Sequence, residues 1–162
     1  MAVALAREEG LEQLRRQRDR LLAVIAPLSE DELTSQPVGG DWSVRDILAH
    51  ILSWEEEAAK RLKLIAKGQT EKIRWVAPAK VDGWNAKARE KKSGMSLAEV
   101  ITKLAARRQE LSKLLERLPE AALTDGARTA LSVWFPNCTY RHEEEHAQQI
   151  KSWLRQLETT EA

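Results

Sequence analysis

The sequence predicts an all-α fold, a four-helix bundle in which long amphipathic helices pack side by side. Four segments repeat apolar residues at three- and four-residue steps, the spacing of an amphipathic helix, and no segment reads convincingly as a strand. Capping boxes, glycines and prolines delimit these segments. With 162 residues and 43% hydrophobic content, the chain is expected to form one domain over residues 1–162 around a single core.

Local signals bound the first two long helices. Residues 11–28 have the pattern of an amphipathic helix, and a Pro-Val-Gly-Gly segment separates it from the next one. Ser43 is expected to cap a second helix over Val44–Ala66, because Asp46 follows three residues later and completes a capping box. Gly68 is expected to end this helix, since glycine readily adopts the left-handed backbone found after many helices.

An insertion separates the second long helix from the third. Residues 69–94 have the least regular pattern and read as a loop plus a short helix that begins near Trp84, an arrangement that can cover a site as a lid. Ser96 and Glu99 then form another capping box at the start of a third long helix over residues 97–118.

The fourth long helix is expected after a loop over residues 124–137. Asn137 is the expected N-cap, and the apolar pattern continues to about Leu157. A weak internal repeat supports a plan of two similar halves, since "LSEDELT" over 28–34 follows the first helix and "LPEAALT" over 118–124 follows the third.

Composition argues against several partners and compartments. Lys plus Arg number 26 against 25 Asp plus Glu, so no charge excess favours nucleic acid or an anionic membrane as a partner. The single cysteine, Cys138, cannot form an internal disulfide, and the first residues lack the apolar run of a signal peptide. No apolar run approaches 18 residues, so we expect a cytoplasmic protein without membrane contact.

The only three histidines of the chain all fall on predicted core-facing positions. His142 and His146 are four residues apart on one helix, which places them on the same face about one turn apart. His50 lies on the apolar face of the second helix, between Ile47 and Trp54. Unpaired imidazoles are costly in an apolar interior, whereas three that converge supply the nitrogen ligands that zinc or a similar divalent metal accepts.

A structural interpretation of these histidines stays open beside the metal site. Each ring can be half-buried and hydrogen-bonded to a neighbour such as Glu55 or Gln149, without any metal. For a lone histidine on a helix, this interpretation is the usual one.

The segment from His142 to His146 also matches H-E-x-x-H, the helix motif of zinc peptidases. Only 16 residues follow His146, none of them a histidine, and no strand edge is predicted to hold an extended peptide, so peptidase activity is not expected. The glutamates 143–145 are expected to form a solvated face near the positive end of the helix. Glu143 is the one candidate catalytic residue among them, as a group that orients a metal-bound water.

Two motifs carry a resemblance to a known family. "WSVRDILAHILSW" over 42–54 and "HEEEHAQQI" over 142–150, in this order, resemble the DinB-like superfamily of bacterial four-helix-bundle proteins. The likeness runs across most of the chain and includes "LPEAAL" and "DGWN". In that family a histidine at this point of the second helix and an H-x-x-x-H pair on the last helix bind a divalent metal. The resemblance therefore implies His50, His142 and His146 as metal ligands.

The sequence departs from the family pattern at one position, and its histidines argue against one branch of the family. Gln149 and Ile150 match the residues that often trail the histidine pair, but Gln148 stands where many relatives have glycine. The ClbS-type branch of the superfamily shares the fold and commonly lacks the histidine triad. The three histidines of this chain argue against that branch.

The resemblance implies a function more broadly than it implies a fold. Some members of the superfamily are thiol transferases, so the first hypothesis is an enzyme whose zinc or nickel ion binds and activates a low-molecular-weight thiol for attack on an electrophilic small molecule. The family also makes a homodimer plausible, although no sequence feature decides it. The expected pocket residues are Trp54, Trp84, Asn85, Trp134 and Tyr140.

Alternatives exist for the pocket and for the activity. Six tryptophans in a bundle are more often core than substrate wall, and Asn85 can simply cap the short helix. The same metal site can instead activate water for hydrolysis of an ester, amide or strained ring, with Glu143 as helper. A non-catalytic bundle that binds a metal or a small molecule is the third hypothesis.

Overall fold

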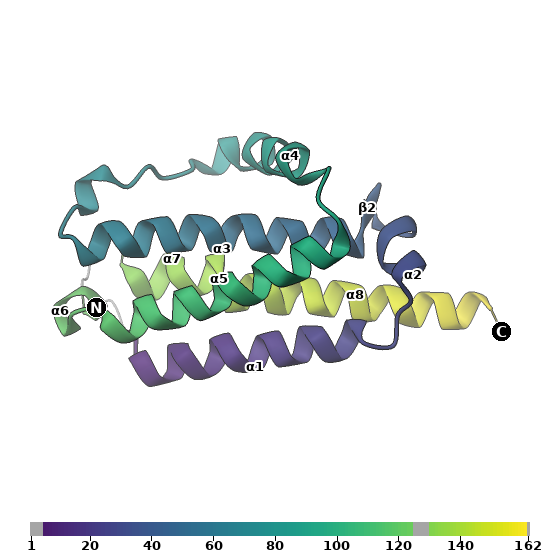
Figure 1. Ribbon diagram of the computed structural model, residues 1–162, viewed down its shortest axis with the longest axis horizontal. Coiled ribbons are helices and arrows are strands. Elements are labelled where there is room, and N and C mark those ends of the chain that lie inside the picture. The colour runs from purple at the N-terminus through teal and green to yellow at the C-terminus, as the bar shows by residue number, and fades with distance from the viewer. Residues whose placement is uncertain (1–4, 125–129, 162) are drawn as a thin grey trace.

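The structure, a computed structural model, describes residues 5–124 and 130–161 as a helical bundle. Its long helices are α1 (Arg7–Ile25), α3 (Val44–Ala66), α5 (Leu97–Arg117) and α8 (Tyr140–Thr160). Figure 1 shows that α1 and α8 run in one direction while α3 and α5 run in the other. The predicted four-helix bundle is therefore confirmed, with one crossover connection, between α3 and α5, in place of a strict up-down order.

Short elements lie in the connection between α1 and α3. They are α2 (Glu30–Ser35), β1 (Pro37–Gly39) and β2 (Trp42–Ser43). The two strands pair antiparallel, so the expectation that the chain has no strand is wrong in this detail. Gly40 makes the turn between them with a φ of 59°, a backbone conformation that costs glycine little.

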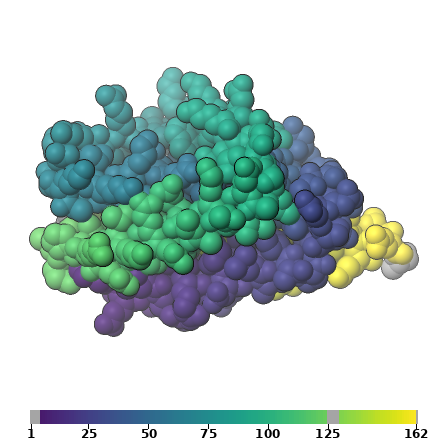
Figure 2. All heavy atoms as spheres, viewed as in Figure 1, coloured from purple at the N-terminus to yellow at the C-terminus, as the bar shows by residue number. Residues whose placement is uncertain are grey.

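The insertion after α3 carries the chain back along the bundle. It contains η1 (Thr70–Lys72), η2 (Pro78–Lys80) and α4 (Val81–Lys92). It forms the upper layer in Figures 1 and 2, over the outer side of α3. Polar contacts attach its end to α3, since Lys92 Nζ lies 2.9 Å from Glu56 Oε2 and Arg45 Nε donates to the Met95 carbonyl at 3.0 Å.

The predicted bounds of α3 are confirmed at both ends. The Ser43 hydroxyl accepts a hydrogen bond from the Asp46 amide at 3.2 Å, and the Asp46 carboxylate accepts one from the Ser43 amide at 3.0 Å. Two residues after the helix, Gly68 has a φ of 67°. The Ser96 and Glu99 box at the start of α5 is also present.

The predicted fourth helix is wrong at its start. The structure has two helices there, α7 (Leu131–Cys138) and α8, after α6 (Glu120–Leu123). Pro136 lies inside α7 and cannot donate a backbone hydrogen bond, and Thr139 leaves the helical conformation with a φ of −124° and a ψ of −104°. Residues 125–129 of the expected loop lie outside the described residues.

The first helix and the internal repeat are closer to expectation. α1 occupies Arg7–Ile25, so it begins four residues and ends three residues before the predicted span. Its earlier end is explained by Pro27, which cannot donate a helical hydrogen bond. The repeated segments do have the same structure, since α2 follows α1 as α6 follows α5.

The core has two apolar halves, one toward each end of the bundle. The first contains Leu14, Ala58, Leu62, Leu111, Leu115 and Phe135, and the second contains Leu21, Ile47, Leu48, Ile51, Val100, Leu104 and Ile150. Between the two halves, each long helix contributes one charged residue to the same level. These residues are Arg18 on α1, Glu55 on α3, Arg108 on α5 and Glu143 on α8, here called the ion quartet.

The members of the ion quartet bind one another across the bundle. Arg18 donates from Nε to Glu143 at 2.5 Å and from Nη2 to Glu55 at 2.8 Å, and Arg108 Nη2 contacts both carboxylates. Both glutamates are 0% exposed, and both arginines are below 10%. The expectation that Glu143 lies on a solvated face is therefore wrong, because this carboxylate is a buried link between α8 and two other helices.

Candidate metal centre

The structure brings the three histidines together where α3 packs against α8. His142 Nε2 lies 2.9 Å from His50 Nε2 and 3.1 Å from His146 Nε2. The ligand atoms of all three residues lie within 4.8 Å of one another. These side chains are here called the histidine triad, and their Nε2 atoms point at a common position.

The surroundings of the histidine triad favour neutral rings. Burial, with a smaller contribution from His146, lowers the pKa of His50 to about 4. Burial also lowers the pKa of His142 to about 2, with repulsion from the other two histidines adding to the effect. The Trp42 ring covers His50 edge-on, with 5.3 Å between centroids. At neutral pH both imidazoles therefore keep a lone pair available for a metal.

A second residue fixes the ring of His146. Its Nδ1 lies 2.9 Å from Gln149 Oε1, and an amide oxygen only accepts, so Nδ1 carries the proton and Nε2 carries the lone pair. Gly39 leaves room for the Gln149 amide, since a Cβ at that position would lie 2.9 Å from its Nε2. The alternative without a metal predicted a hydrogen bond from a histidine to Gln149, and that bond is present. Because it uses Nδ1 of His146, the Nε2 of His146 stays free for the triad.

Gln149 offers a test of this arrangement. Gln149→Leu is expected to weaken zinc or nickel binding by about 10- to 100-fold, because the His146 ring loses the acceptor that sets its orientation. Gln148→Leu is the matched control, since Gln148 is the exposed neighbour and Gln149 is the residue that bonds to His146. Competition with a chromophoric chelator measures both affinities, and equal losses in the two variants would contradict the assigned role.

The donor set fits a metal better than it fits hydrogen bonds alone. A neutral imidazole Nε2 either donates one hydrogen or accepts, yet His142 Nε2 faces two other Nε2 atoms at once. Tetrahedral ligands at 2.0 to 2.1 Å from zinc are about 3.3 Å apart, close to the observed separations. The described cluster contains histidines only. The triad is therefore compatible with a divalent metal of the zinc type.

The pH dependence of the metal-free protein follows from these pKa values. The unfolded chain protonates its histidines near pH 6.5, whereas folded His50 and His142 resist protonation until far lower pH. Between about pH 6.5 and pH 4 the unfolded state therefore holds more protons than the folded state, so the free energy of unfolding decreases as the pH decreases. Urea denaturation in chelator should show a loss of roughly 1–2 kcal/mol per histidine from pH 7 to 5, allowing for the partial exposure of His142. His142→Leu should have about half the slope, and a flat wild-type profile would contradict the prediction.

Three of the five predicted pocket residues, Trp54, Trp84 and Asn85, contact one another beside the triad. The Trp54 ring is 6.4 Å from His142 and packs against Trp84 of α4 at 4.2 Å, with the rings tilted by 36°. Trp54 Nε1 donates to Asn85 Oδ1 at 3.0 Å. Asn85 lies inside α4 and does not cap it, so the capping interpretation is wrong. These three side chains join the insertion to the site.

The other predicted residues are not brought to the triad. Trp134 packs near Trp75 and Phe135 with Arg61 over its ring, and Tyr140 packs near Phe135. Both belong to the apolar half of the core that contains Leu14, so the core interpretation holds for them. Glu143 likewise lies in the ion quartet, where arginines contact both of its oxygens.

Trp42 is the neighbour that sequence reasoning missed. It precedes the N-cap of α3, and two turns of helix separate it from His50 in sequence. The hairpin of β1 and β2 folds it back against that ring. An aromatic residue beside a capping box was visible in the sequence, but its direction depends on the hairpin.

Comparisons with known proteins agree with this fold. An uncharacterised protein from Escherichia coli UTI89 superposes with a TM-score of 0.80, at 15% identity over 96% of each chain. The sibling lethal factor precursor DfsB gives 0.80, at 11% identity over 96% of this chain and 98% of that one. The colibactin self-resistance protein ClbS, in a complex with double-stranded DNA, gives 0.79, at 15% identity over 94% and 98%. These identities support the shared fold alone.

The sequence comparisons identify the family. No curated protein sequence matches this chain. In the part of the chain that the structure describes, no helix combines the length and apolar character needed to cross a bilayer. The family model of the DinB superfamily matches residues 13–150, most of the chain, and the protein belongs to that superfamily.

Proposed function

We propose that this protein is a metal-dependent enzyme whose ligands are His50, His142 and His146. The convergence of the three Nε2 atoms carries the proposal, since residues 92 positions apart meet within hydrogen-bond distance. Zinc and nickel are the expected metals, because neutral imidazoles suit both. Three protein ligands leave a coordination position for a substrate, as in catalytic zinc sites.

The reaction that this site supports best is transfer of a low-molecular-weight thiol to an electrophilic small molecule. A bound divalent ion lowers the pKa of a coordinated thiol and so supplies a thiolate at neutral pH. The chain itself keeps His50 and His142 neutral by burial and orients His146 through Gln149. Trp54 and Trp84 present an aromatic wall beside His142 for the apolar part of the electrophile.

Hydrolysis by a metal-activated water has less support. A water mechanism is helped by a nearby carboxylate that orients the water, and Glu143 was the candidate for that role. Both Glu143 oxygens accept hydrogen bonds from arginines of the ion quartet. The cluster at the triad contains no carboxylate among the described residues. Thiol transfer depends less on such a base, because a metal-bound thiol loses its proton outright, whereas zinc-bound water keeps a pKa near 7.

Turnover of a chromogenic electrophile tests the proposed reaction. Metal-loaded protein is mixed with 1-chloro-2,4-dinitrobenzene and either bacillithiol, mycothiol or no thiol, and a His142→Ala variant serves as the blank. The proposal expects product formation above the blank only when both metal and thiol are present. Thiol-independent turnover of an ester or amide would favour the hydrolase, and absence of turnover by metal-loaded protein would favour a non-catalytic metal-binding bundle.

The partner proposed for this site is a small molecule and not a nucleic acid. The DNA in the ClbS complex is a property of that protein, at 15% identity to this one. Here 26 basic and 25 acidic residues nearly balance, which offers little attraction to a phosphate backbone. We place the activity in the cytoplasm, where low-molecular-weight thiols are kept reduced.

A further inference from the structure

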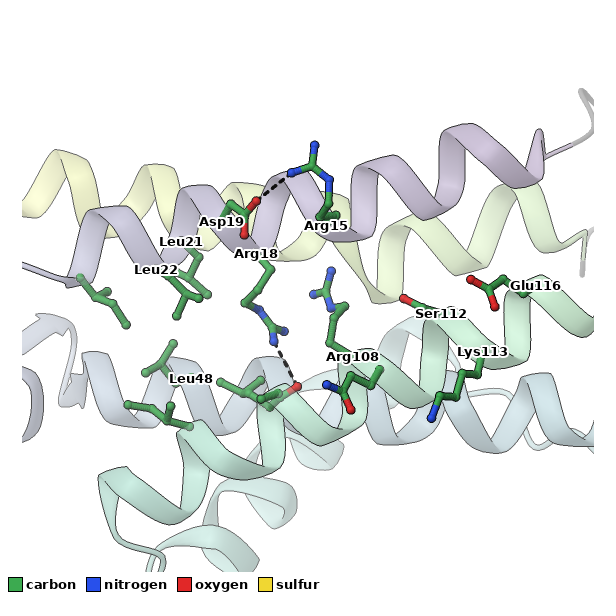
Figure 3. Close-up of a pocket in the computed structure, with 15 residues that line it drawn as sticks. Arg15, Arg18, Asp19, Leu21, Leu22, Leu48, Arg108, Ser112, Lys113 and Glu116 are labelled. Carbon is green, nitrogen blue, oxygen red and sulfur yellow. Dashed lines mark hydrogen bonds and ion pairs between the residues drawn. The ribbon is translucent and has the colours of Figure 1, made fainter.

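A cavity lies between α1 and α5, apart from the histidine triad. Its volume is about 640 Å³, and Figure 3 shows it as an elongated cleft whose walls are these two helices and whose floor includes Leu48 of α3. No histidine lines it.

One half of the cleft is apolar from floor to rim. Leu21, Leu48 and Leu104 form the floor and are between 0% and 4% exposed. Leu22 and Ile101 form the rim and are 43% and 37% exposed. They are two of the four exposed large apolar side chains among the described residues, so apolar surface open to solvent gathers at this mouth.

The other half of the cleft presents guanidinium groups. Figure 3 shows Arg18 from α1 and Arg108 from α5 reaching toward one another across it. Arg18 makes three hydrogen bonds, to Glu143, Glu55 and the Leu104 carbonyl, and a guanidinium has five N–H groups. It therefore keeps donors for a ligand while it holds the ion quartet together.

Charge on the lining favours an anion at this end. Arg15 pairs with Asp19 at 2.9 Å, which leaves Arg18, Arg108 and Lys113 on the lining against the acidic Glu116. The glutamates that balance Arg18 and Arg108 are 0% exposed and do not line the cleft. A ligand in the cleft thus meets more positive than negative side chains.

We infer that this cleft binds an anionic amphiphile, a medium-chain carboxylic acid. Its alkyl tail covers Leu22 and Ile101 and fills the apolar half, and its carboxylate lies at the end lined by Arg18 and Arg108. Seven residues of α5 separate Ile101 from Arg108, about 10 Å along the helix, a length comparable to the tail of such an acid. Burial of the tail supplies affinity, and the guanidinium groups set the direction of the ligand.

Titration calorimetry with decanoate, below its micelle concentration, tests this inference. The wild-type protein is expected to show one saturable site. Ala105→Trp places an indole in the cleft and should weaken binding at least tenfold, about 1.4 kcal/mol. Ala106→Trp is the matched control, because Ala106 is also exposed on α5 but does not line this cleft, and its affinity should stay within about twofold of wild type.

Two further measurements separate the headgroup from the tail. Lys113→Glu leaves the ion quartet intact and should weaken decanoate by about three- to tenfold, and neutral decanol should bind at least tenfold more weakly than decanoate. If decanol binds as tightly as decanoate, the cleft does not recognise an anionic headgroup. If Ala105→Trp and Ala106→Trp change the affinity for decanoate equally, the ligand does not bind in this cleft. Absence of saturable binding would overturn the site altogether.

Size-exclusion chromatography tests whether a second copy of the chain, and not a small ligand, occupies the cleft. A wild-type dimer that Ala105→Trp splits while decanoate fails to bind would make the cleft a subunit interface and overturn the inference. Metal content of Ala105→Trp should equal that of wild type, because the cleft and the histidine triad share no residue. Failure at the cleft is thereby distinguishable from failure of the metal centre.

Discussion

Replacement of Glu143 by alanine is expected to lower the free energy of unfolding by about 3–5 kcal/mol. The variant removes one carboxylate of the ion quartet and leaves Arg18 and Arg108 sharing Glu55 alone, so the bundle centre holds an uncompensated positive charge. A buried charge without its partner keeps the full cost of its lost hydration. Such a loss is a large fraction of the roughly 5–15 kcal/mol by which an ordinary domain is stable.

Glu145→Ala is the matched control for this prediction. Glu145 is two residues along the same helix and exposed, and alanine favours helix, so the change should stay within about 0.5 kcal/mol. Urea denaturation followed by far-UV circular dichroism measures both variants at pH 7. Similar small losses for Glu143→Ala and Glu145→Ala would show that the quartet does not hold the helices together.

Replacement of His142 by alanine is expected to lower the bound metal from about one ion per chain to below a tenth. His142 is the middle member of the triad, in contact with both other histidines through Nε2. Without it, two imidazoles remain, and a two-ligand site binds zinc or nickel far more weakly than a three-ligand one. Its side chain lies outside the ion quartet, so the fold should persist.

Arg141→Ala controls for a change at the start of α8. Arg141 is the exposed neighbour of His142, and its variant should keep the metal content of wild type. Elemental analysis gives the ratio of metal to protein, and far-UV circular dichroism checks that both variants are folded. His146→Ala, with the same expected loss, covers the case in which His142→Ala fails to fold. Retention of metal by both folded histidine variants would exclude the triad.

The two groups on α8 explain how one helix serves both the core and the site. Glu143, Ala147 and Ile150 repeat at four- and three-residue steps and face the interior. His142, His146 and Gln149 repeat with the same spacing one position earlier, about 100° around the helix. The buried Glu143 therefore sets the rotation of α8 that directs the histidines toward His50.

Sequence reasoning succeeded where the signal is local. The bounds of α3 follow from the capping box of Ser43 and Asp46 and from Gly68, and all of these act within one turn of the helix end. The pairing of His142 with His146 also follows from local periodicity, because a four-residue step places both on one face of α8. That face is half-buried beside the interior face, whereas His50 is buried on α3. These predictions did not require knowing which helix packs against which.

Predictions failed where the outcome depends on distant residues. Glu143 reads as solvent-exposed beside two other glutamates, and its burial depends on Arg18 and Arg108, 125 and 35 residues away. Its spacing from Ala147 and Ile150 was the available signal. Trp134 and Tyr140 have the composition of a pocket wall, but both are buried in the core, Trp134 on α7 and Tyr140 at the start of α8. Pro136 inside α7 made this pair of helices hard to predict.

The metal content of His50→Ala tests the metal centre most directly, because His50 reaches the other two ligands only through the fold. Wild-type protein reconstituted with zinc or nickel and dialysed should retain about one ion per chain, and His50→Ala, folded by circular dichroism, should retain almost none. No bound metal in the wild type at any loading, or equal retention in the variant, would contradict a site built from these three histidines.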